Sequence, residues 1–253
     1  MSGSFTVIIP ARFGSTRFEG KPLAKINSKS MILHVIDRAK EAGASTVIVA
    51  TDDQRIADEV GDAAQVCMTS PDHNSGTERL AEVIEAMNLA DDDIVVNVQG
   101  DEPFIPAENI RQVAANLKRS GAEMATLSTS IETVDDLFNP NIVKVVPNRE
   151  SKALYFSRSV VPFERDTMMK GKPKDLDLNQ FHRHIGIYAY TAGYIKQYVN
   201  YAPSVLEVTE SLEQLRALWY GDAIHIERAV APPPIGIDTP EDLANLLAKL
   251  NEG

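Results

Sequence analysis

The sequence predicts an α/β protein with a doubly wound, mostly parallel sheet and a smaller mixed subdomain. Strand-like and helix-like segments alternate throughout the first half of the chain, which is the pattern of parallel strands joined by helices. Two strand-like runs, residues 6–9 and 94–98, are largely apolar, as is typical of strands buried on both faces. In the second half the alternation is less regular, so we expect the subdomain there. Ligands of such sheets bind beyond the carboxyl ends of the strands.

Composition limits the classes of function. The chain has 253 residues, of which 43% are hydrophobic and 24% charged, an ordinary globular composition that suits one large domain. The formal net charge of −11 argues against a general nucleic-acid or membrane-surface binder, because either partner would repel the average surface. Cys67 is the only cysteine, which favours a reducing compartment. With no signal peptide or long apolar stretch, we expect a cytoplasmic protein without nucleic-acid or membrane partners.

The first strand, residues 6–9, ends at Pro10 and runs into a loop that has the features of a polyanion site. Glycines allow the backbone to approach an anion, hydroxyls donate hydrogen bonds, and cations supply charge for a triphosphate. These residues are Gly14, Gly20, Ser15, Thr16, Arg12, Arg17 and Lys21. We call residues 10–23 the first loop. It is not a Walker A motif, because five residues rather than four separate its glycines and Pro22 replaces the magnesium-binding hydroxyl. A solvated basic surface loop is the alternative interpretation.

The segments that follow continue the alternation of helices and strands. Apolar residues recur at helical spacing or in short runs, and Gly, Asp and Thr stand at the expected ends. We expect, in order, a helix over residues 31–42 ended by Gly43, a strand over 46–50, a short helix capped by Asp52 or Asp53, a strand over 64–68 and a helix opened by Thr77.

The strand over residues 94–98 ends in the sequence Q-G-D-E-P. Gly100 frees the backbone so that Asp101 and Glu102 emerge at the strand end. Magnesium favours one or two carboxylates with waters and phosphate oxygens, so a carboxylate here is placed to hold that ion. The alternative is that one of them caps a turn before Pro103. Because both strand ends lie at one edge of a parallel sheet, we expect the cationic first loop and this acidic site to meet over one triphosphate.

The second half of the chain mixes strands, helices and one polar segment. We interpret residues 161–178, which are rich in turn formers, as a mobile surface excursion. Residues 183–190 form a strand with His184 and Tyr188 among its polar residues, and its periodicity favours a core histidine at 184. The other expected elements are helices over residues 110–117, 192–199 and 205–220, strands over 124–130, 142–147 and 153–156, and a final helix begun by Asp238 or Thr239.

The first loop, with the strand before it, resembles the N-terminal motif of the sugar nucleotidyltransferases. I-I-P-A-R-F-G-S-T-R-F-E-G-K-P-L is most similar to the version in the 3-deoxy-manno-octulosonate (Kdo) cytidylyltransferases. The resemblance covers essentially the whole chain, through A-T-D-D, D-H-N-S-G-T-E-R-L-A-E-V, V-N-V-Q-G-D-E-P, N-P-N-I-V-K-V-V, A-L-Y-F-S-R, R-H-I-G-I-Y, L-E-Q-L-R, L-W-Y-G and G-I-D-T-P-E-D-L. It implies a nucleotidyltransferase-type sheet and an enzyme that joins CTP to a sugar acid for lipopolysaccharide biosynthesis.

The resemblance also implies how the chain is divided and which residues bind nucleotide. Residues 1–253 would form a single domain, with a core for CTP and Mg²⁺ made of residues 1–130 and 221–253. Asp101 and Asp238 would hold the Mg²⁺. The residues implied in catalysis are Arg12, Lys21 and Asp101, and those implied in CTP binding are Arg12, Ser15, Lys21, Ser75, Gly76, Thr77, Arg79 and Gln99.

Residues 131–220 would then form a sugar-binding and dimerisation subdomain. The residues implied at the sugar are Gln99, Arg158, His184, Tyr188, Glu213 and Gln214, with Arg158 as a clamp on the sugar carboxylate. The family is dimeric, and residues 153–220 hold more aromatic side chains than a small subdomain easily buries, which favours a homodimer. Those side chains are Tyr155, Phe156, Tyr194, Tyr198, Tyr201, Trp219 and Tyr220.

Some positions depart from the family pattern near the expected sugar site. Glu19 replaces a usual proline and Thr191 a usual basic residue, which makes the site more anionic, and Val208 and residues 231–234 are also unusual. The 8-amino-3,8-dideoxy analogue of Kdo carries an ammonium that a carboxylate could bind, so both sugars stay open. The candidate carboxylates are Glu19, Glu207 and Glu210. Alternative functions are transfer to another sugar acid, such as a sialic acid, and a nucleotide-binding module without catalysis.

Overall fold

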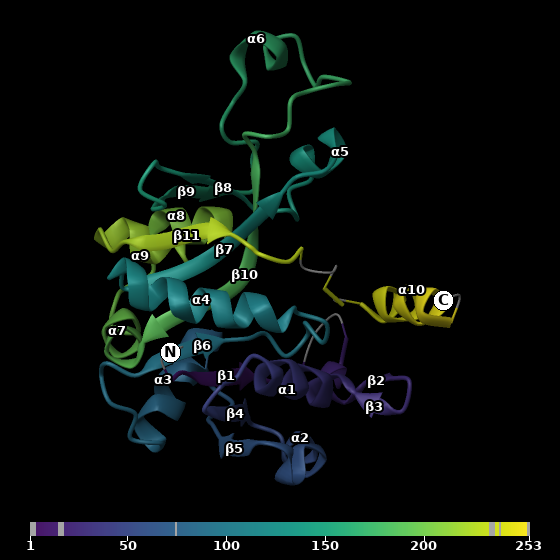
Figure 1. The fold of residues 1–253 in the computed structure, drawn as a ribbon, viewed down its shortest axis with the longest axis vertical. Helices are drawn as coiled ribbons and strands as arrows, with labels where there is room; N and C mark the ends of the chain where they lie inside the picture. The colour runs from purple at the N-terminus through teal and green to yellow at the C-terminus, as the bar shows by residue number, and fades with distance from the viewer. Residues whose placement is uncertain (1–3, 15–17, 74, 233–235, 238, 252–253) are drawn as a thin grey trace.

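One nine-stranded sheet runs through the molecule, with helices packed on both of its sides (Figure 1). The computed structural model describes residues 4–14, 18–73, 75–232, 236–237 and 239–251. The main path of the sheet has the order β11 (Ile224–Arg228), β7 (Met124–Ser130), β10 (His182–Thr191), β6 (Ile94–Asn97), β1 (Thr6–Pro10), β4 (Thr46–Thr51) and β5 (Gln65–Met68). Beside this path, β8 (Lys144–Pro147) pairs with β10 and with β9 (Ala153–Ser157).

The sheet is mostly parallel, which confirms the predicted fold class. β1 pairs in parallel with β4 and β6, β4 with β5, and β11 with β7. On the main path β10 is the exception, because it runs antiparallel between β6 and β7, and beside the path β8 pairs antiparallel with β10 and β9. β11 was missed from the sequence, although the alternation of apolar and polar residues in I-H-I-E-R was an available signal.

Helices bury both faces of the sheet. α1 (Met31–Glu41), α2 (Gln54–Val60) and α4 (Ala107–Ser120) contribute to one hydrophobic cluster, and α3 (Gly76–Ala86), α7 (Ala192–Tyr198) and α9 (Leu215–Tyr220) to the other. In β1, Val7 and Ile9 belong to the first cluster and Ile8 to the second, since successive side chains point to opposite faces. Within the described ranges, no helix is long and apolar enough to cross a membrane.

The predicted surface excursion leaves β9 and returns into β10, and Figure 1 shows it projecting away from the sheet. Its helix α6 (Arg165–Met168) belongs to a small core of its own, in which Met168 and Phe181 pack with Ile131 and Leu137 of the neighbouring segment that contains α5 (Val134–Phe138). At its base, the β8–β9 hairpin pairs with the first residues of β10. β10 falls within the predicted subdomain yet lies inside the main sheet.

The prediction of a single helix over residues 205–220 is wrong, because the structure contains two short helices there. α8 (Val205–Glu210) begins at Ser204, whose Oγ accepts a hydrogen bond from Glu207 N at 3.1 Å. It ends where Ser211 adopts the left-handed conformation, with φ 50° and ψ 50°, which an α-helix cannot continue. α9 begins four residues later. We call the connecting residues 211–214 the pocket turn.

The last helix, α10 (Pro240–Asn251), begins at the predicted place. Thr239 Oγ1 accepts a hydrogen bond from Asp242 N at 3.2 Å, and Asp242 Oδ2 accepts one from Thr239 N at 2.8 Å. This reciprocal cap fixes the helix start. Asp238, the other candidate cap, lies outside the described residues. The preceding Ile237 is buried with Ile26, so the start of α10 packs beside the small hairpin of β2 (Lys25–Ile26) and β3 (Lys29–Ser30).

Candidate functional site

The ends of β1 and β6 lie side by side at the edge of the sheet where ligands were expected. Ile8 is in register with Asn97, and Val98 N donates to Ile8 O at 3.2 Å. Beyond them, Gly100 approaches β1 so closely that a Cβ at this position would lie 3.0 Å from Pro10 O. A glycine permits this approach because it has no side chain. The two strand-end motifs therefore meet, as the sequence predicted.

Lys21 and Asp101 connect these two motifs directly. Lys21 Nζ donates to Asp101 Oδ2 at 2.7 Å. The lysine is buried on the 3-10 turn η1 (Lys21–Leu23), whereas 38% of the Asp101 side chain is exposed. An ammonium beside a partly exposed carboxylate is suited to a phosphate and its counterion. Arg12 lies exposed in the same loop, and Ser15 lies outside the described residues.

The donors at this edge fit Mg²⁺. Among the described residues no three His, Cys, Asp or Glu side chains form a metal cluster. Mg²⁺ needs only one or two carboxylates, because waters and substrate phosphate oxygens complete its coordination. Asp101 offers a hard carboxylate ligand, and Ile237 N donates to Asp101 O at 3.4 Å. The chain next to Asp238 therefore lies beside Asp101, although Asp238 itself lies outside the described residues.

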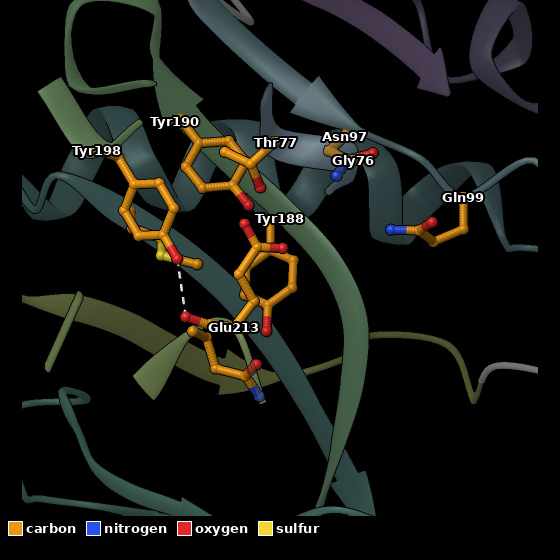
Figure 2. Close-up of a pocket in the computed structure, with 10 residues that line it drawn as sticks. Gly76, Thr77, Asn97, Gln99, Tyr188, Tyr190, Tyr198 and Glu213 are labelled. Atoms are coloured by element: carbon orange, nitrogen blue, oxygen red, sulfur yellow. Dashed lines mark hydrogen bonds between the residues drawn. The ribbon is translucent and has the colours of Figure 1, made fainter. Parts of the chain in front are cut away.

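A pocket of about 270 Å³ opens beside this edge, on the face of the sheet that α3, α7 and α9 cover. Figure 2 shows three tyrosines grouped with Thr77 and Glu213, with Asn97 and Gln99 to one side. We call it the tyrosine pocket. Its lining residues are Gly76, Thr77, Asn97, Gln99, Met124, Tyr188, Tyr190, Tyr198, Glu213 and Gln214.

The tyrosine pocket brings together six of the residues implied by the resemblance. These are Gly76, Thr77, Gln99, Tyr188, Glu213 and Gln214. Ser75 lies next to them as the cap of α3, where its Oγ accepts a hydrogen bond from Glu78 N at 3.2 Å. The sequence reasoning missed four lining residues. Asn97 had a signal, as a polar residue inside an apolar strand, and Met124 had none. Tyr190 was not assigned to the site, and Tyr198 was assigned to a dimer interface instead.

Three buried polar atoms in the tyrosine pocket find no hydrogen-bond partner within the described part of the chain. They are Asn97 Oδ1, Tyr188 Oη and Glu213 Oε1. A buried polar group without a partner costs about 1–3 kcal/mol, so native proteins rarely leave several together. Two of these atoms are acceptors and the third is a hydroxyl, so a ligand rich in hydroxyl groups would satisfy them.

Burial sets the charge states around the pocket. Desolvation raises the pKa of Glu213, and the nearby hydroxyls of Thr77 and Ser75 and the Arg216 guanidinium oppose that shift. The pKa of Tyr188 is also raised well above its usual value by burial, so its phenol stays protonated and can donate a hydrogen bond. Tyr198 Oη donates to Glu213 O at 2.8 Å, the dashed line in Figure 2, and so supports the pocket turn from α7.

A series of stacked, tilted or edge-on aromatic rings leads from the tyrosine pocket to the surface. Neighbouring ring centroids are 5.9 Å apart at Tyr188 and Tyr190, 6.4 Å at Tyr190 and Tyr194, and 4.0 Å at Tyr201 and Tyr220. The series is Tyr188, Tyr190, Tyr194, Tyr198, Tyr201 and Tyr220. We call it the tyrosine series. Its packing uses aromatic residues that the sequence had assigned to a dimer interface.

His184 lies behind the pocket rather than in its lining. Its ring packs edge-on to Phe156 at 5.1 Å and tilted against Tyr188 at 5.3 Å, and its Nε2 is 3.0 Å from Thr126 Oγ1. Burial lowers the pKa of His184 to about 3, and the positive charge of Arg183 adds to the effect. It is therefore neutral, as the core interpretation expected, and direct contact with a sugar stays a prediction.

Two of the expected ligand-binding arginines donate to protein atoms instead of facing the pocket. Arg79 is 1% exposed; it donates to Asp52 Oδ2 at 3.1 Å and to Thr69 Oγ1, which ties together the segments that follow β4 and β5. The guanidinium of Arg158 donates to three backbone carbonyls and is absent from the pocket lining. Roles for either arginine at a ligand stay predictions.

The positions that favoured an amino sugar do not form an anionic wall in the pocket. Glu207 accepts a hydrogen bond from Arg216 Nε at 2.8 Å, and Glu210 accepts from Ser157 Oγ at 2.7 Å and Arg158 N at 2.9 Å. Thr191 pairs with Ile94 at the opposite edge of the sheet, where it caps α7. Glu19 is exposed in the first loop. Thr191 therefore lies away from the pocket, whereas a role of Glu19, Glu207 or Glu210 at the sugar stays a prediction. Glu213 is the carboxylate that lines the pocket.

The chain is similar over nearly its whole length to known cytidylyltransferases. A family model described as cytidylyltransferase matches residues 6–226. A 3-deoxy-manno-octulosonate cytidylyltransferase of Alteromonas mediterranea is 67% identical over 245 residues, covering 96% of this chain and 98% of that protein. One from Vibrio vulnificus is 59% identical over 241 residues, covering 95% of each. A solved CMP:2-keto-3-deoxy-manno-octonic acid synthetase complexed with CTP is 38% identical, covers 99% of both chains and superposes with a TM-score of 0.88.

The neutral His184 predicts a measurable pH dependence of stability. Its folded-state pKa of about 3 lies below the ordinary value of 6.5, so between these values the unfolded chain binds a proton that the folded protein does not. His184 alone should therefore lower the free energy of unfolding by about 1.4 kcal/mol for each pH unit below roughly 6. Replacing His184→Gln should remove this contribution, which urea unfolding at pH 6.5 and 5.0 would measure.

The quantity to compare is the change in the free energy of unfolding between the two pH values. The absolute free energy is not suitable, because the substitution also changes packing against Phe156 and Tyr188. Carboxylates titrate equally in both proteins and cancel in this difference. If His184→Gln and the original chain lose the same free energy between pH 6.5 and 5.0, His184 does not stay neutral and the assigned environment is wrong.

Proposed function

The chain belongs to the 3-deoxy-manno-octulosonate cytidylyltransferase family, and from this premise we propose that it condenses CTP with an eight-carbon 3-deoxy-octulosonic acid. The products are the CMP-sugar and pyrophosphate. The observation that carries the proposal is the tyrosine pocket beside the Lys21–Asp101 pair, with its three polar atoms that lack a partner among the described residues. The CMP-sugar is the activated form of the sugar for lipopolysaccharide biosynthesis, and we place the reaction in the cytoplasm.

The reaction needs two substrates held end to end. Gln99 lines the tyrosine pocket and Asp101 follows it at the end of β6, so a sugar in the pocket lies next to triphosphate bound at the first loop. The anomeric hydroxyl then attacks the α-phosphorus in line and pyrophosphate leaves, with no covalent enzyme intermediate. Most of the rate gain comes from orientation of the two substrates.

The reaction also requires that the negative charge on the phosphates be stabilised. Among the described residues of the first loop, Lys21 and Arg12 are the cations offered to the triphosphate, and Lys21 is held in place by Asp101. Asp101, with Asp238 expected beside it, would hold Mg²⁺, which supplies further positive charge at the transferring and leaving groups. Stabilisation of that developing charge by groups already in position lowers the barrier.

The polar atoms of the pocket suit a polyhydroxylated sugar acid. Asn97 Oδ1 and Glu213 Oε1 accept hydrogen bonds, and Tyr188 Oη, kept protonated by burial, can donate one. A hydroxyl or an ammonium on the sugar can donate to Glu213, so these contacts suit both Kdo and its 8-amino analogue. Competition between the two at equal concentration, compared as kcat/KM, decides between them.

The reaction is tested by pyrophosphate release with each nucleoside triphosphate and a panel of Kdo, its 8-amino analogue and a sialic acid, with and without Mg²⁺. We expect release only with CTP, Mg²⁺ and an octulosonic acid. Product from the sialic acid alone would assign a different acceptor. Equilibrium binding of CTP without product from any sugar would instead favour a nucleotide-binding module, and the enzymatic proposal would be abandoned.

Asp101→Asn should reduce kcat by about a hundredfold or more, because the amide loses the charge that holds Mg²⁺ and pairs with Lys21. The melting temperature should change by only about 2 °C, since the carboxylate is partly exposed. Asp92→Asn is the matched control: it makes the same chemical change at an exposed position near the opposite edge of the sheet and should leave kcat unaltered. Equal activity in the two variants would remove Asp101 from the site.

We further propose a homodimer that uses the outer face of β9, α8 and α9. Phe156, Tyr194 and Tyr198, which the sequence assigned to an interface, are buried in the core. Large apolar side chains nevertheless remain exposed on these elements, which pack against one another: Leu154, Val205, Val208, Trp219 and Tyr220. Such patches are typical of interfaces.

Light scattering at micromolar concentration should give a mass twice that of the 27.7 kDa chain. Leu154→Lys together with Trp219→Lys should convert this species to a monomer, since the two charges would be desolvated in the interface. A monomer mass for the original chain would exclude the dimer, and a dimer mass for the double variant would place the interface elsewhere.

A further inference from the structure

We propose that Arg158 and Glu210 are positioning residues that hold the pocket turn in place for the sugar. The inference deepens the proposed function and rests on it, because its meaning for catalysis depends on a sugar that binds at Glu213 and Gln214. Both of these side chains lie on the pocket turn and line the tyrosine pocket. Arg158 and Glu210 lie outside the lining, at the junction of β9 and α8.

The guanidinium of Arg158 caps the end of α8. Its Nε donates to Glu210 O at 2.7 Å and its Nη2 to Ser211 O at 3.3 Å, while Nη1 donates to Pro140 O at 3.1 Å. The last carbonyls of a helix have no partner within the helix, and a basic side chain can satisfy them. Arg158 thus fixes the residues from which the pocket turn starts.

Glu210 returns the interaction to β9. Its carboxylate accepts one hydrogen bond from Ser157 Oγ at 2.7 Å and a second from Arg158 N at 2.9 Å. The side chain of Arg158 hydrogen-bonds to the backbone of Glu210, and the side chain of Glu210 hydrogen-bonds to the backbone of Arg158. The end of β9 and the end of α8 therefore cannot shift independently. The same hydrogen bonds direct the Glu210 carboxylate to β9 rather than into the tyrosine pocket.

Lys144 anchors the backbone at this junction between β9 and α8. Its ammonium is fully buried and donates to Asn139 O at 3.0 Å, to Ile142 O at 2.6 Å and to Arg158 O at 2.6 Å. These bonds use the three N–H groups that an ammonium has. The backbone of Arg158 is therefore anchored in the β8–β9 hairpin while its side chain reaches the pocket turn.

The pocket turn requires such support because its own residues do not favour its backbone conformation. Ser211 is held in the left-handed region, which costs a residue other than glycine about 1 kcal/mol, and the flanking α8 and α9 have only six residues each. On the pocket side, Glu213 Oε1 has no partner within the described residues. A displacement of about 1 Å in a substrate-positioning group can reduce turnover a hundredfold.

Kinetics separate a positioning role from direct contact with the sugar carboxylate. Arg158→Ala and Glu210→Ala should each raise the KM for the octulosonic acid about ten- to hundredfold, with a much smaller change in the KM for CTP. Glu210→Gln keeps one acceptor oxygen and should recover part of the loss. In the double variant Arg158→Ala/Glu210→Ala the effects should not add, because each single change breaks the same junction. Arg149→Ala, exposed on the tip of the β8–β9 hairpin, is the matched control and should leave both KM values unchanged.

Hydrogen–deuterium exchange gives a readout that does not depend on turnover. In both alanine variants the amides of residues 211–215 should exchange about tenfold faster, while those of β1 and α3 keep their rates, which shows that the protein is still folded. Unchanged exchange over residues 211–215 would overturn the proposal. So would a raised sugar KM in Arg158→Ala with none in Glu210→Ala, which would assign Arg158 to the sugar itself. Absence of turnover in the original chain would reject the proposed function instead, and the exchange measurement would still decide the role of the junction.

Discussion

The architecture depends on one strand, β10, running antiparallel between β6 and β7. Residues 188–191 pair with β6 and residues 182–190 with β7, so this strand alone connects the parallel strands of the first half to β7 and β11. Its register shifts between Ile185 and Tyr188, where Thr126 Oγ1 donates to Ile187 O at 2.7 Å. Because Tyr188 lies on this strand, the alignment of the sheet and the shape of the tyrosine pocket are fixed together.

The first half of the fold and the start of α10 could be predicted because their signals are local. β1 is apolar at successive positions since Val7 and Ile8 enter different cores, and Thr239 and Asp242 form their cap within one turn. The break between α8 and α9 had no such signal. Ser211 is not a residue that marks a turn by itself, and its conformation is held by an arginine 53 positions away in the chain. Long-range hydrogen bonds decided the local structure there.

The same distinction applies to the candidate site. Lys21 and Asp101 follow neighbouring parallel strands, so topology alone predicted that they would meet. The identity of an arginine predicts its charge but not where its side chain points. Arg79 donates to a half-buried aspartate and Arg158 to carbonyl oxygens, and neither partner can be recognised from spacing. Tyr194 and Tyr198 likewise resemble interface residues in composition, although their rings pack against one another in the core.

The tyrosine series also has an optical consequence. Aromatic rings at these separations exchange excitation energy, and the outermost ring, Tyr220, adjoins Trp219, the only tryptophan of the chain. Light absorbed by phenols in the pocket can thus be emitted by an indole on the surface. Near-ultraviolet circular dichroism and intrinsic fluorescence of the unlabelled protein would register a change in packing around Tyr188. The tyrosine series thus links the tyrosine pocket to the indole of Trp219 at the surface.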